Sequence, residues 1–384
     1  MPCLEAAPFE TISAPAPTQE FHVETITDYR EFVRLKPVWD RLVDAADPRH
    51  PFLEHDWIRT WWDCFGHQSQ LYILVVKSGD GPVAIAPLIQ TSVRMWGIPV
   101  RRLGFFYNDH VPRAGFIVPG ESADAYRAIW NHLLRNRCWD LLQLCQLPED
   151  SETLAAVSVL ASQDGCASGL WPSSESPYIR LETSWNEYFG QLETKFRANL
   201  RNRFKRLSAI GPLEAVTPTE PDADRLQAAF DLEAAGWKRE AGTAISCDAN
   251  LRRFYTLLAQ RAAERGWLRL QFLQSAAYCV AFGYSLVYKN RQFLLKTGFD
   301  PDYAPFSPSN LLVCRVLEQA FEQGIEVYDF LGDSADWKQR WTSDVKRHYW
   351  LFVFANTFKG RLLHAIKFRL VPLAKSFLGK EARR

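Results

Sequence analysis

The sequence predicts an α/β (α+β) protein built from two tandem units, each with a mixed, mostly antiparallel sheet flanked by helices. Short β-rich segments alternate with segments of helical periodicity along the chain. The same order of elements, a helix, three strands, a helix and a strand, occurs in both halves. In each half a helix separates two strands, which favours a right-handed crossover and one parallel pair in an otherwise antiparallel sheet.

The first half begins with an amphipathic helix, in which apolar residues recur at helical spacing until Gly66 ends it. These residues are Phe52, Trp57, Ile58, Trp61, Trp62 and Phe65. Two strands are expected over 71–77 and 83–90, because Ser78, Gly79, Asp80 and Gly81 between them suit a hairpin turn. A third strand is expected over 102–107, followed by a helix over 122–137 and a strand over 139–145.

The second half repeats this order. A helix is expected over 251–265, ended by Gly266, and then strands over 267–273, 278–288 and 293–299. The next helix is expected over 308–323, with Ser307 as its N-cap and Pro308 at its first position. Gly324 ends that helix, and a closing strand is expected over 325–331.

Four segments follow from this pattern. Residues 1–20 are rich in proline, alanine, serine and threonine and are expected to be a disordered leader. Residues 21–185 are predicted to be the N-terminal unit with a crossing segment over 146–185, punctuated by Pro148, Pro172 and Pro177. Residues 186–357 are predicted to be the C-terminal unit, and residues 358–384 a basic amphipathic tail.

Composition excludes several classes of protein. The 45 Lys and Arg residues nearly balance 44 Asp and Glu residues, so the chain as a whole has no electrostatic reason to bind nucleic acid. Its apolar runs are shorter than the roughly 20 residues of a membrane span, and residues 1–10 do not resemble a secretory signal. We therefore expect a cytoplasmic protein, with peripheral contact at the inner membrane face left open. The aromatic content of 14% fits a thick core better than a ligand cleft.

Cysteine and histidine give no sign of a metal site. The eight cysteines have no C-x-x-C spacing and no nearby His pair, so we expect reduced thiols, no disulfide framework and no metal. These cysteines are Cys3, Cys64, Cys138, Cys145, Cys166, Cys247, Cys279 and Cys314. Among the histidines, His110 follows Asn108 and Asp109 in an expected loop and could serve as a base, although a structural role is favoured.

The start of the helix at Pro308 offers an anion site. Backbone N–H groups at a helix N-terminus point outward along the helix dipole and suit a phosphate. Pro308 lacks an N–H, but Ser309, Asn310 and Leu311 are expected to keep theirs free. An ordinary corner between a strand and a helix explains the same pattern.

Several motifs in this region together resemble CelD-like acetyltransferases, which belong to the GNAT acyltransferase superfamily near its FemAB-like, double-domain branch. The motifs are Lys296–Tyr303, Ser307–Leu312, Tyr328–Asp333 and Trp337–Trp341. Two looser stretches extend the resemblance, which covers about residues 50–350. They comprise Leu232–Glu233 with Trp237–Lys238 and Gly242–Ile245, and Phe52–Leu53 with Trp57, Trp62 and Ala86–Leu88.

This resemblance implies two GNAT-like folds in tandem and an acyl-CoA (acetyl-CoA) donor. It also implies acyl transfer to an amine of a sugar, an amino acid or another small metabolite, in the setting of polysaccharide biosynthesis. The donor's pantetheine arm would lie between the strands expected over 293–299 and 325–331, which separate in this fold. One departure is clear: the Gly-rich loop Q/R-x-x-G-x-G/A of most GNAT enzymes is replaced by Ser307–Asn310.

The residues that would carry the chemistry lie near this gap. Asp329 and Asp333 are the catalytic candidates for proton transfer or acceptor binding, and Lys338 or the N–H of Gly298 could stabilise developing charge. The donor site is predicted to comprise Gly298, Phe306, Ser307, Pro308, Ser309, Asn310 and Leu311. The acceptor site is predicted to comprise Trp237, Lys238, Lys296 and Trp337. Structural readings remain open: Asp329 as a buried ion pair, Asp333 in a plain turn and Lys338 as a surface lysine.

Two basic amphipathic segments also admit more than one interpretation. The helix over 195–206 could contact the phosphates of CoA, an anionic acceptor or tRNA, or be a solvated face. The tail over 358–384 could lie on an anionic bilayer, against a partner or on its own domain. Two alternative functions follow: a FemAB-like ligase that uses aminoacyl-tRNA, and a non-catalytic GNAT-fold scaffold of polysaccharide synthesis.

Overall fold

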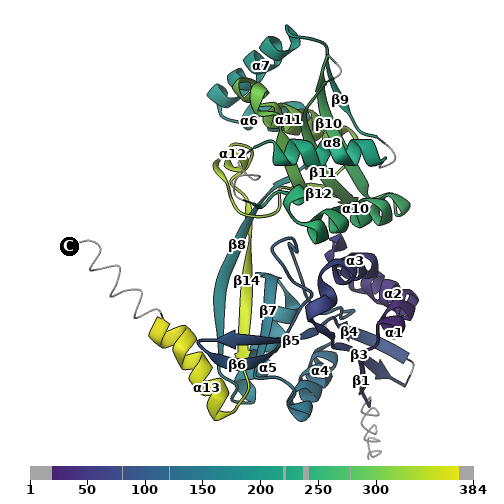
Figure 1. Cartoon of the computed structure of the whole chain (residues 1–384), viewed down its shortest axis with the longest axis vertical. Helices are drawn as coiled ribbons and strands as arrows, with labels where there is room; N and C mark the ends of the chain where they lie inside the picture. Colours follow the sequence, from purple (N-terminus) through teal and green to yellow (C-terminus); the bar gives the residue numbers. More distant parts are fainter. Residues whose placement is uncertain are drawn as a thin grey trace, which may run out of the picture.

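The computed structural model describes residues 20–79, 81–120, 122–218, 222–236, 242–276 and 278–371. Apart from Glu20, the leader expected over 1–20 therefore lies outside the described residues, as do residues 372–384 of the predicted tail. The chain forms two lobes, which we call lower and upper as they stand in Figure 1.

The lower lobe contains the first half of the chain, and the last strand and helix return to it (Figure 1). In chain order its elements are β1 His22–Ile26, α1 Tyr29–Arg34, α2 Lys36–Ala46, η1 Pro51–Leu53, α3 His55–Phe65, η2 Gly66–Gln68, β2 Gln70–Leu71, β3 Ile73–Ser78, β4 Gly81–Ala86, β5 Ile89–Met95, β6 Ile98–Gly104, α4 Ala123–Asn136, β7 Leu141–Pro148, α5 Glu152–Gln163 and β8 Ser168–Arg180, followed much later by β14 Val345–Phe354, α13 Phe358–Ala365 and the π-helical turn η5 Ile366–Leu370.

The upper lobe contains the elements between β8 and β14. These are α6 Trp185–Gln191, α7 Thr194–Ser208, β9 Leu213–Val216, α8 Ala223–Ala234, η3 Ile245–Cys247, α10 Ala249–Glu264, β10 Leu268–Ser275, β11 Tyr278–Tyr288, β12 Arg291–Phe299, η4 Pro301–Phe306, α11 Pro308–Glu322, β13 Val327–Asp329 and α12 Asp336–Gln339.

Local sequence explains many of these boundaries. The side chains of Ser122 and Asp248 accept hydrogen bonds from the first amides of α4 and α10, as N-caps do. Lys289 and Asn290 have φ of 46° and 57°, the left-handed conformation that a two-residue hairpin between β11 and β12 requires. Ser307 is the N-cap of α11 and Pro308 its first residue, as predicted, but Ser307 has a φ of 47° and its side chain makes no capping hydrogen bond.

Eleven strands of the described residues form one continuous sheet in the order β2-β5-β6-β7-β14-β8-β13-β12-β11-β10-β9, and β1, β3 and β4 form a second sheet. In the eleven-stranded sheet, neighbouring strands are antiparallel except β6 with β7 and β12 with β13, which are parallel. A helix, α4 or α11, separates the two strands of each parallel pair. The predicted fold class and both parallel pairs are confirmed.

The segment over 146–185 holds regular structure. It contains α5 and the long strand β8, which pairs with β14 up to Pro177 and with β13 from Tyr178. A proline cannot donate to a strand ladder, and both prolines of β8 lie where the ladder is interrupted. Pro172 lies beside a register shift in β14, and Pro177 lies where β8 changes partner.

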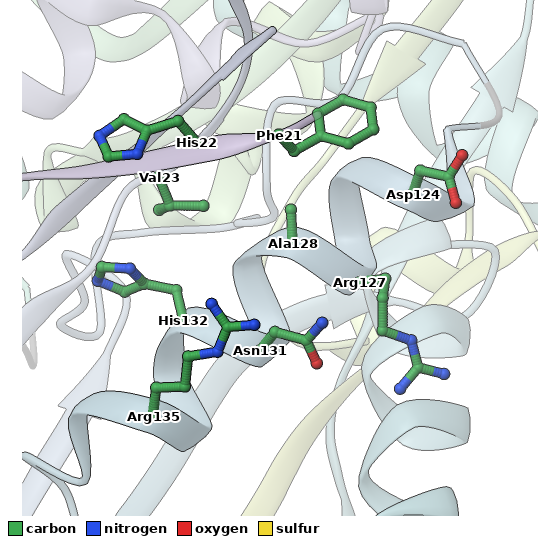
Figure 2. A pocket seen from close by; sticks show the side chains of 9 residues that line it. All are labelled: Phe21, His22, Val23, Asp124, Arg127, Ala128, Asn131, His132 and Arg135. Carbon is green, nitrogen blue, oxygen red and sulfur yellow. The ribbon is translucent and has the colours of Figure 1, made fainter. Parts of the chain in front are cut away.

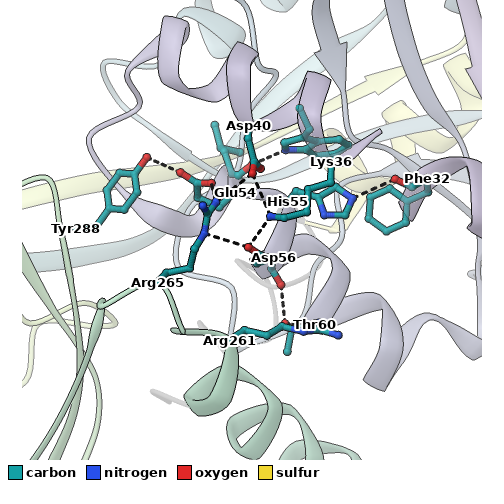
Figure 3. A network of polar contacts seen from close by, with 12 residues as sticks. Phe32, Lys36, Asp40, Glu54, His55, Asp56, Thr60, Arg261, Arg265 and Tyr288 are labelled. Carbon is teal, nitrogen blue, oxygen red and sulfur yellow. Dashed lines mark hydrogen bonds and ion pairs between the residues drawn. The ribbon is translucent and has the colours of Figure 1, made fainter. Parts of the chain in front are cut away.

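The two lobes share an aromatic core and a charged contact. Trp39, Trp57 and Trp61 of the lower lobe are buried in one cluster with residues of α10, β11 and β12, which agrees with the core interpretation of the aromatic content. Beside it, Arg265, the C-cap of α10, contacts Asp40, Glu54 and Asp56, as Figure 3 shows. The hydroxyl of Tyr288 donates to Glu54 at 2.6 Å. Burial raises the pKa of the Glu54 carboxyl.

No helix within the described residues combines the length and the apolar character needed to cross a membrane. The cysteines of this part of the chain are free thiols.

Candidate functional site

The two parallel strands of the upper lobe diverge. They pair at only three positions, from Arg291 opposite Val327 to Phe293 opposite Asp329. Beyond this point β12 continues to Phe299, whereas the chain after β13 follows β8, because the amide of Phe330 donates to Pro177. The expected opening between the strands is therefore present.

A cavity of about 740 Å³ occupies this opening. Its walls are β12 from Leu294 to Phe299, the start of α11, the turn after β13, and the ends of α8 and α12. They comprise Leu232, Glu233, Gly236, Leu294, Leu295, Lys296, Thr297, Gly298, Phe299, Ala304, Ser307, Ser309, Asn310, Phe330, Leu331, Gly332, Asp333, Ala335, Trp337 and Lys338. We call it the gap cavity.

The predicted donor residues divide into two groups. Gly298, Ser307, Ser309 and Asn310 line the gap cavity. Pro308 and Leu311 are buried residues of α11 itself, and Phe306 lies under Arg206 of α7, at 5.1 Å from the guanidinium carbon to the ring centre.

Gly298 has a packing reason to be glycine. A Cβ there would lie 2.8 Å from the carbonyl oxygen of Leu232 and 2.9 Å from the Cα of Glu233. The absence of a side chain thus lets the end of α8 contact β12 at the wall of the gap cavity.

The anion site at the start of α11 is smaller than expected. The amides of Asn310 and Leu311 both donate to the carbonyl of Ser307, at 3.0 and 3.3 Å. Leu311 makes the first regular helical bond, and Asn310 makes the tighter bond that often closes a first turn. The expectation of three free amides was therefore wrong, and Ser309 has the remaining N–H without an intrahelical acceptor.

A β-bulge faces the same cavity. Tyr284 of β11 lies opposite Lys296 and Ser285 lies opposite Leu294, so Leu295 has no partner in the register. A bulge of this kind turns its backbone out of the ladder. Leu295 lines both the gap cavity and a neighbouring one described below. Sequence reasoning missed it, because residues 293–297 around the bulge contain no glycine or proline to indicate one.

Arg113 of the lower lobe lies at the point where β12 and β13 diverge. Its Nη2 lies 2.5 Å from Oδ2 of Asp329, and its guanidinium carbon is 5.8 Å from the ring centre of Phe293, the register partner of Asp329. Its Nε donates to Nε2 of His348 at 3.2 Å, and burial lowers the pKa of that histidine to about 4. Asp329 is thus a buried carboxylate in an ion pair, and it is not among the residues that line the gap cavity.

The other oxygen of Asp329 organises the turn that follows β13. Its Oδ1 accepts from the amide of Leu331 at 2.9 Å. Leu331 and Gly332 have φ of 50° and 56°, a left-handed pair that costs energy at the leucine. The Arg113–Asp329 pair therefore holds the strained backbone that presents Asp333 to the gap cavity.

Lys338 is fixed against the same turn. Its Nζ donates to the carbonyl oxygens of Leu331 at 2.5 Å and Asp333 at 2.9 Å. Burial lowers the pKa of Lys338 to about 8, although the charges of Asp333 and Asp329 oppose this shift. The structure thus brings Asp333, Trp337 and Lys338 together at one wall of the gap cavity.

A second cavity of about 400 Å³ adjoins the first and is lined by both lobes. It shares Leu295, Lys296, Leu331, Gly332 and Asp333 with the gap cavity, so Asp333 lies where the two cavities meet. The lower lobe contributes Tyr107, Asp109, His110, Val111, Pro112, Gln146, Ser173 and Ser174. We call it the junction cavity.

Tyr255 of α10 completes the junction cavity. Its hydroxyl lies 3.3 Å from Nδ1 of His110, and Nζ of Lys296 lies 5.4 Å from its ring centre. Burial, aided by the charge of Glu233, raises the pKa of Tyr255. His110, a weak candidate in the sequence, is thus placed in the candidate site.

Glu233 is a further residue that the sequence reasoning did not assign to the site. It is buried, it lines the gap cavity, and its Oε2 accepts from the amide of Ile245 at 2.8 Å. A signal existed: Leu226, Ala229, Phe230 and Glu233 follow the i, i+3, i+4, i+7 pattern of one buried helix face. The predicted acceptor residues Trp237 and Lys238 lie outside the described residues.

A separate pocket of about 480 Å³ lies between β1 and α4 in the lower lobe, and His22, His132 and Arg135 are among its walls, as Figure 2 shows. It shares no residue with the gap or junction cavity. In the part of the chain that the structure describes, no group of three or more His, Cys, Asp or Glu residues is placed to hold a metal ion.

The family comparison matches the segment that holds the gap cavity. Residues 194–339, from the start of α7 to the end of α12, match the model of the acetyltransferase (GNAT) domain family. This part of the chain carries a GNAT domain. The finer, CelD-like resemblance stays a prediction, and no curated protein matches the sequence.

Solved structures with a similar fold extend over most of the chain. FemX has a TM-score of 0.58 at 11% identity, covering 82% of this chain and 93% of FemX. A protein of unknown function from Bacteroides thetaiotaomicron has a TM-score of 0.51 at 13% identity, covering 87% of this chain and 100% of that one. The C-terminal domain of a putative lysylphosphatidylglycerol synthetase from Agrobacterium fabrum has a TM-score of 0.51 at 14% identity, covering 87% of this chain and 95% of that domain. At these identities the likeness concerns the fold alone.

Proposed function

We propose that the protein is an acyl-CoA-dependent N-acyltransferase that acylates an amine of a sugar, an amino acid or another small metabolite. The observation that carries this proposal is the gap cavity, which opens where β12 and β13 diverge inside the GNAT domain. Donor and acceptor would then approach Asp333 from two adjoining cavities.

The gap cavity fits the narrow arm of an acyl-CoA. Its volume of about 740 Å³ lies within the usual range of ligand pockets, and β12 offers it an edge that β13 does not pair. The N–H of Ser309 at the start of α11 would bind phosphate oxygen. Because this is one donor rather than a glycine-rich cradle, the basic face of α7, whose Arg206 packs over Phe306, would supply further positive charge.

The residues around Asp333 suit amide formation. An ammonium must lose a proton before its nitrogen attacks the thioester carbonyl, and the oxygen that gains charge needs stabilisation. In the proposed reaction one proton passes to Asp333, the C–N bond forms and the C–S bond breaks. The second proton leaves the nitrogen and protonates the thiolate. Lys338 and the backbone N–H at the Leu295 bulge would stabilise the oxygen, and Asp329 would hold the turn.

The acceptor would bind in the junction cavity. Lys296 lines both cavities and Trp337 lines the gap cavity, so both would contact the reacting groups, while Trp237 and Lys238 stay predictions for the same site. Use of acyl-CoA would place the reaction in the cytoplasm, and a role in polysaccharide biosynthesis is part of the proposal.

A thiol-release assay tests this proposal. Acyl-CoAs of increasing chain length are offered with a library of amines, and we expect CoA release that depends on both. Asp333→Asn and Lys338→Ala should each lower turnover by about ten-fold or more. Asp336→Asn is the matched control, because Asp336 is exposed and does not line the gap cavity. If the folded protein binds neither acyl-CoA by calorimetry nor charged tRNA, the non-catalytic scaffold replaces the enzyme.

A second candidate, a FemAB-like ligase using aminoacyl-tRNA, is favoured by one observation. Helix α7 packs Phe196, Leu200 and Leu207 inward and turns a basic face to solvent. Titration with charged tRNA separates the candidates, since tRNA affinity should fall steeply with salt. Tight, salt-sensitive tRNA binding without acyl-CoA binding would favour the ligase.

A further inference from the structure

Helix α13 is anchored to the lower lobe by its inner face. Leu363 is fully buried against the sheet, and the Nζ of Lys359 lies 2.7 Å from Oδ2 of Asp140. Gly360 touches the strand end so closely that a Cβ there would overlap the carbonyl oxygen of Ala355. The helix is therefore docked on the lower lobe through its inner face.

The outer face of this helix is nevertheless apolar and basic. Phe358 is 85% exposed, Leu362 40% and Leu370 56%, and Arg361 and Arg369 are exposed beside them. We call these five residues the outer face of α13, although Arg369 and Leu370 belong to the π-helical turn. No acidic residue occurs from 358 to 371.

An aromatic residue on β8 extends this surface. Lys367 packs its ammonium 4.1 Å from the ring centre of Phe352 and 4.6 Å from that of Trp171. Trp171 is itself 41% exposed. Indole rings that are part buried and part exposed suit the boundary between water and lipid headgroups.

We propose that the outer face of α13 docks the protein on an anionic lipid bilayer. The inference goes beyond the proposed reaction and does not depend on it. Apolar side chains that lie between arginines on an exposed helix can insert among acyl chains, while the arginines contact anionic headgroups. The sequence after Val371 continues the same charge, with Lys375, Lys380, Arg383 and Arg384 against Glu381 alone.

Charge complementarity favours lipid over a protein partner as the occupant. A protein would need a groove shaped to three separated apolar side chains on one convex helix, whereas a bilayer adapts to them. Figure 1 shows α13 on the outside of the lower lobe, at the end of the molecule away from α7 and α12. Docking there would leave the upper lobe clear of the membrane.

The test is sedimentation of the full chain with vesicles. We expect binding to vesicles of phosphatidylcholine with about one third phosphatidylglycerol, little binding to phosphatidylcholine alone, and weaker binding as salt is raised. The variant Phe358→Ser/Leu362→Ser/Leu370→Ser and the variant Arg361→Glu/Arg369→Glu should each bind at least about ten-fold more weakly. Point variants are used because deletion would uncover Leu363 and the sheet beneath it.

Matched controls make the test specific. Val159→Ser/Ile210→Ser/Tyr278→Ser replaces three similarly exposed apolar residues elsewhere, and Arg41→Glu/Arg135→Glu reverses two exposed charges on other helices. Both should bind vesicles as the natural sequence does. Absence of phosphatidylglycerol-dependent binding, or an equal loss in the controls, would overturn the proposal. So would an outer face that instead mediates self-association in analytical ultracentrifugation.

Discussion

The parallel strand pairs of the two lobes share one topology and differ in what lies beside them. In each lobe a helix separates the two strands, and the pair joins at three register positions. In the lower lobe β6 ends at Gly104, the last paired residue, whereas in the upper lobe β12 runs six residues beyond its last pair at Phe293. The topology alone therefore does not create a binding cavity.

The lower lobe fills the place where the upper lobe is open. There the strands approach so closely that a Cβ on Gly104 would lie 2.6 Å from the carbonyl oxygen of Gln143. The amide of Ala114 then donates to Gln146 on the continuing edge of β7, and Phe105 and Phe116 are buried beside it. The segment over 105–118 thus contacts the edge of β7 through Ala114, beyond the paired region.

The segment over 105–118 also contributes residues to the candidate site of the upper lobe. It carries His110 to the junction cavity and Arg113 to the ion pair with Asp329. The comparison teaches that in the first lobe the loop after β6 contacts β7 at the place where the second lobe is open, and that the same loop contributes residues to the site of the second lobe.

The largest expected effect is a loss of stability when the ion pair of Arg113 with Asp329 is removed. Arg113→Ala leaves the buried carboxylate of Asp329 without its partner, which should cost about 3–5 kcal/mol of unfolding free energy. Urea unfolding measures this loss. Arg113→Ala combined with Asp329→Asn should recover part of it, because no unpaired charge remains. An unchanged stability in the single variant would show that the loop does not support the upper lobe.

Closing the upper opening should abolish donor binding. Ser309→Trp places an indole in the gap cavity, and we expect acyl-CoA affinity to fall by about a hundred-fold or more through overpacking. Isothermal titration calorimetry measures the affinity. Ser309→Gly is the matched control and should bind at least as well as the natural sequence. Equal affinity in both variants would place the donor elsewhere.

The pH dependence of turnover should report Lys338. Its positive charge is present below a pKa of about 8 and is lost above it, so turnover should decline as the pH rises through 8. Lys338→Arg should move this decline to higher pH, which a pH–rate profile measures. Because the folded pKa lies below the ordinary value of 10.5, the unfolded chain binds more protons between these values. Stability should therefore rise with pH across that window relative to Lys338→Met, and a flat difference would contradict the assigned pKa.

The smallest effect, a loss of unfolding free energy, is expected at the parallel strands β6 and β7 of the lower lobe. Gly104→Ala forces a methyl group against the backbone of Gln143 and should cost about 1–3 kcal/mol of unfolding free energy. Acyl-CoA affinity should stay unchanged, because Gly104 does not line the gap cavity. Gly79→Ala is the control, since nothing lies within 4 Å of its added Cβ. Loss of donor binding in Gly104→Ala alone would mean that the lower pair also serves the donor.

The periodicity of apolar residues predicted the helices and strands on either side of the gap cavity. The contacts between residues distant in the sequence depend on packing and were not predicted. Helix α11, strands β11 and β12 and both parallel pairs followed from apolar spacing and from the turn residues between them. The buried face of α8 carried Glu233, yet nothing in the sequence said that this face borders a cavity. The pairing of Arg113 with Asp329 joins residues 216 positions apart, which no local pattern can reveal.

The site was predicted in the same uneven way. Asp333, Lys338, Lys296 and Trp337 do line the opening that the sequence indicated. The number of free amides at Ser309–Leu311 was overestimated, because the carbonyl of Ser307 accepts from the amides of both Asn310 and Leu311. The role of His110 depends on Tyr255, which comes from the other lobe.

Strand β14 pairs with β7 in the sheet of the lower lobe, although its residues are synthesised near the end of the chain. His348 pairs with Pro148, so about 200 residues must leave the ribosome before β7 gains this neighbour. Until then the nascent lower lobe presents a bare strand edge, a state that invites mispairing with other chains. A fragment that stops after β8 should consequently aggregate or recruit chaperones, and the lower lobe should acquire its final fold only once the GNAT domain has been translated.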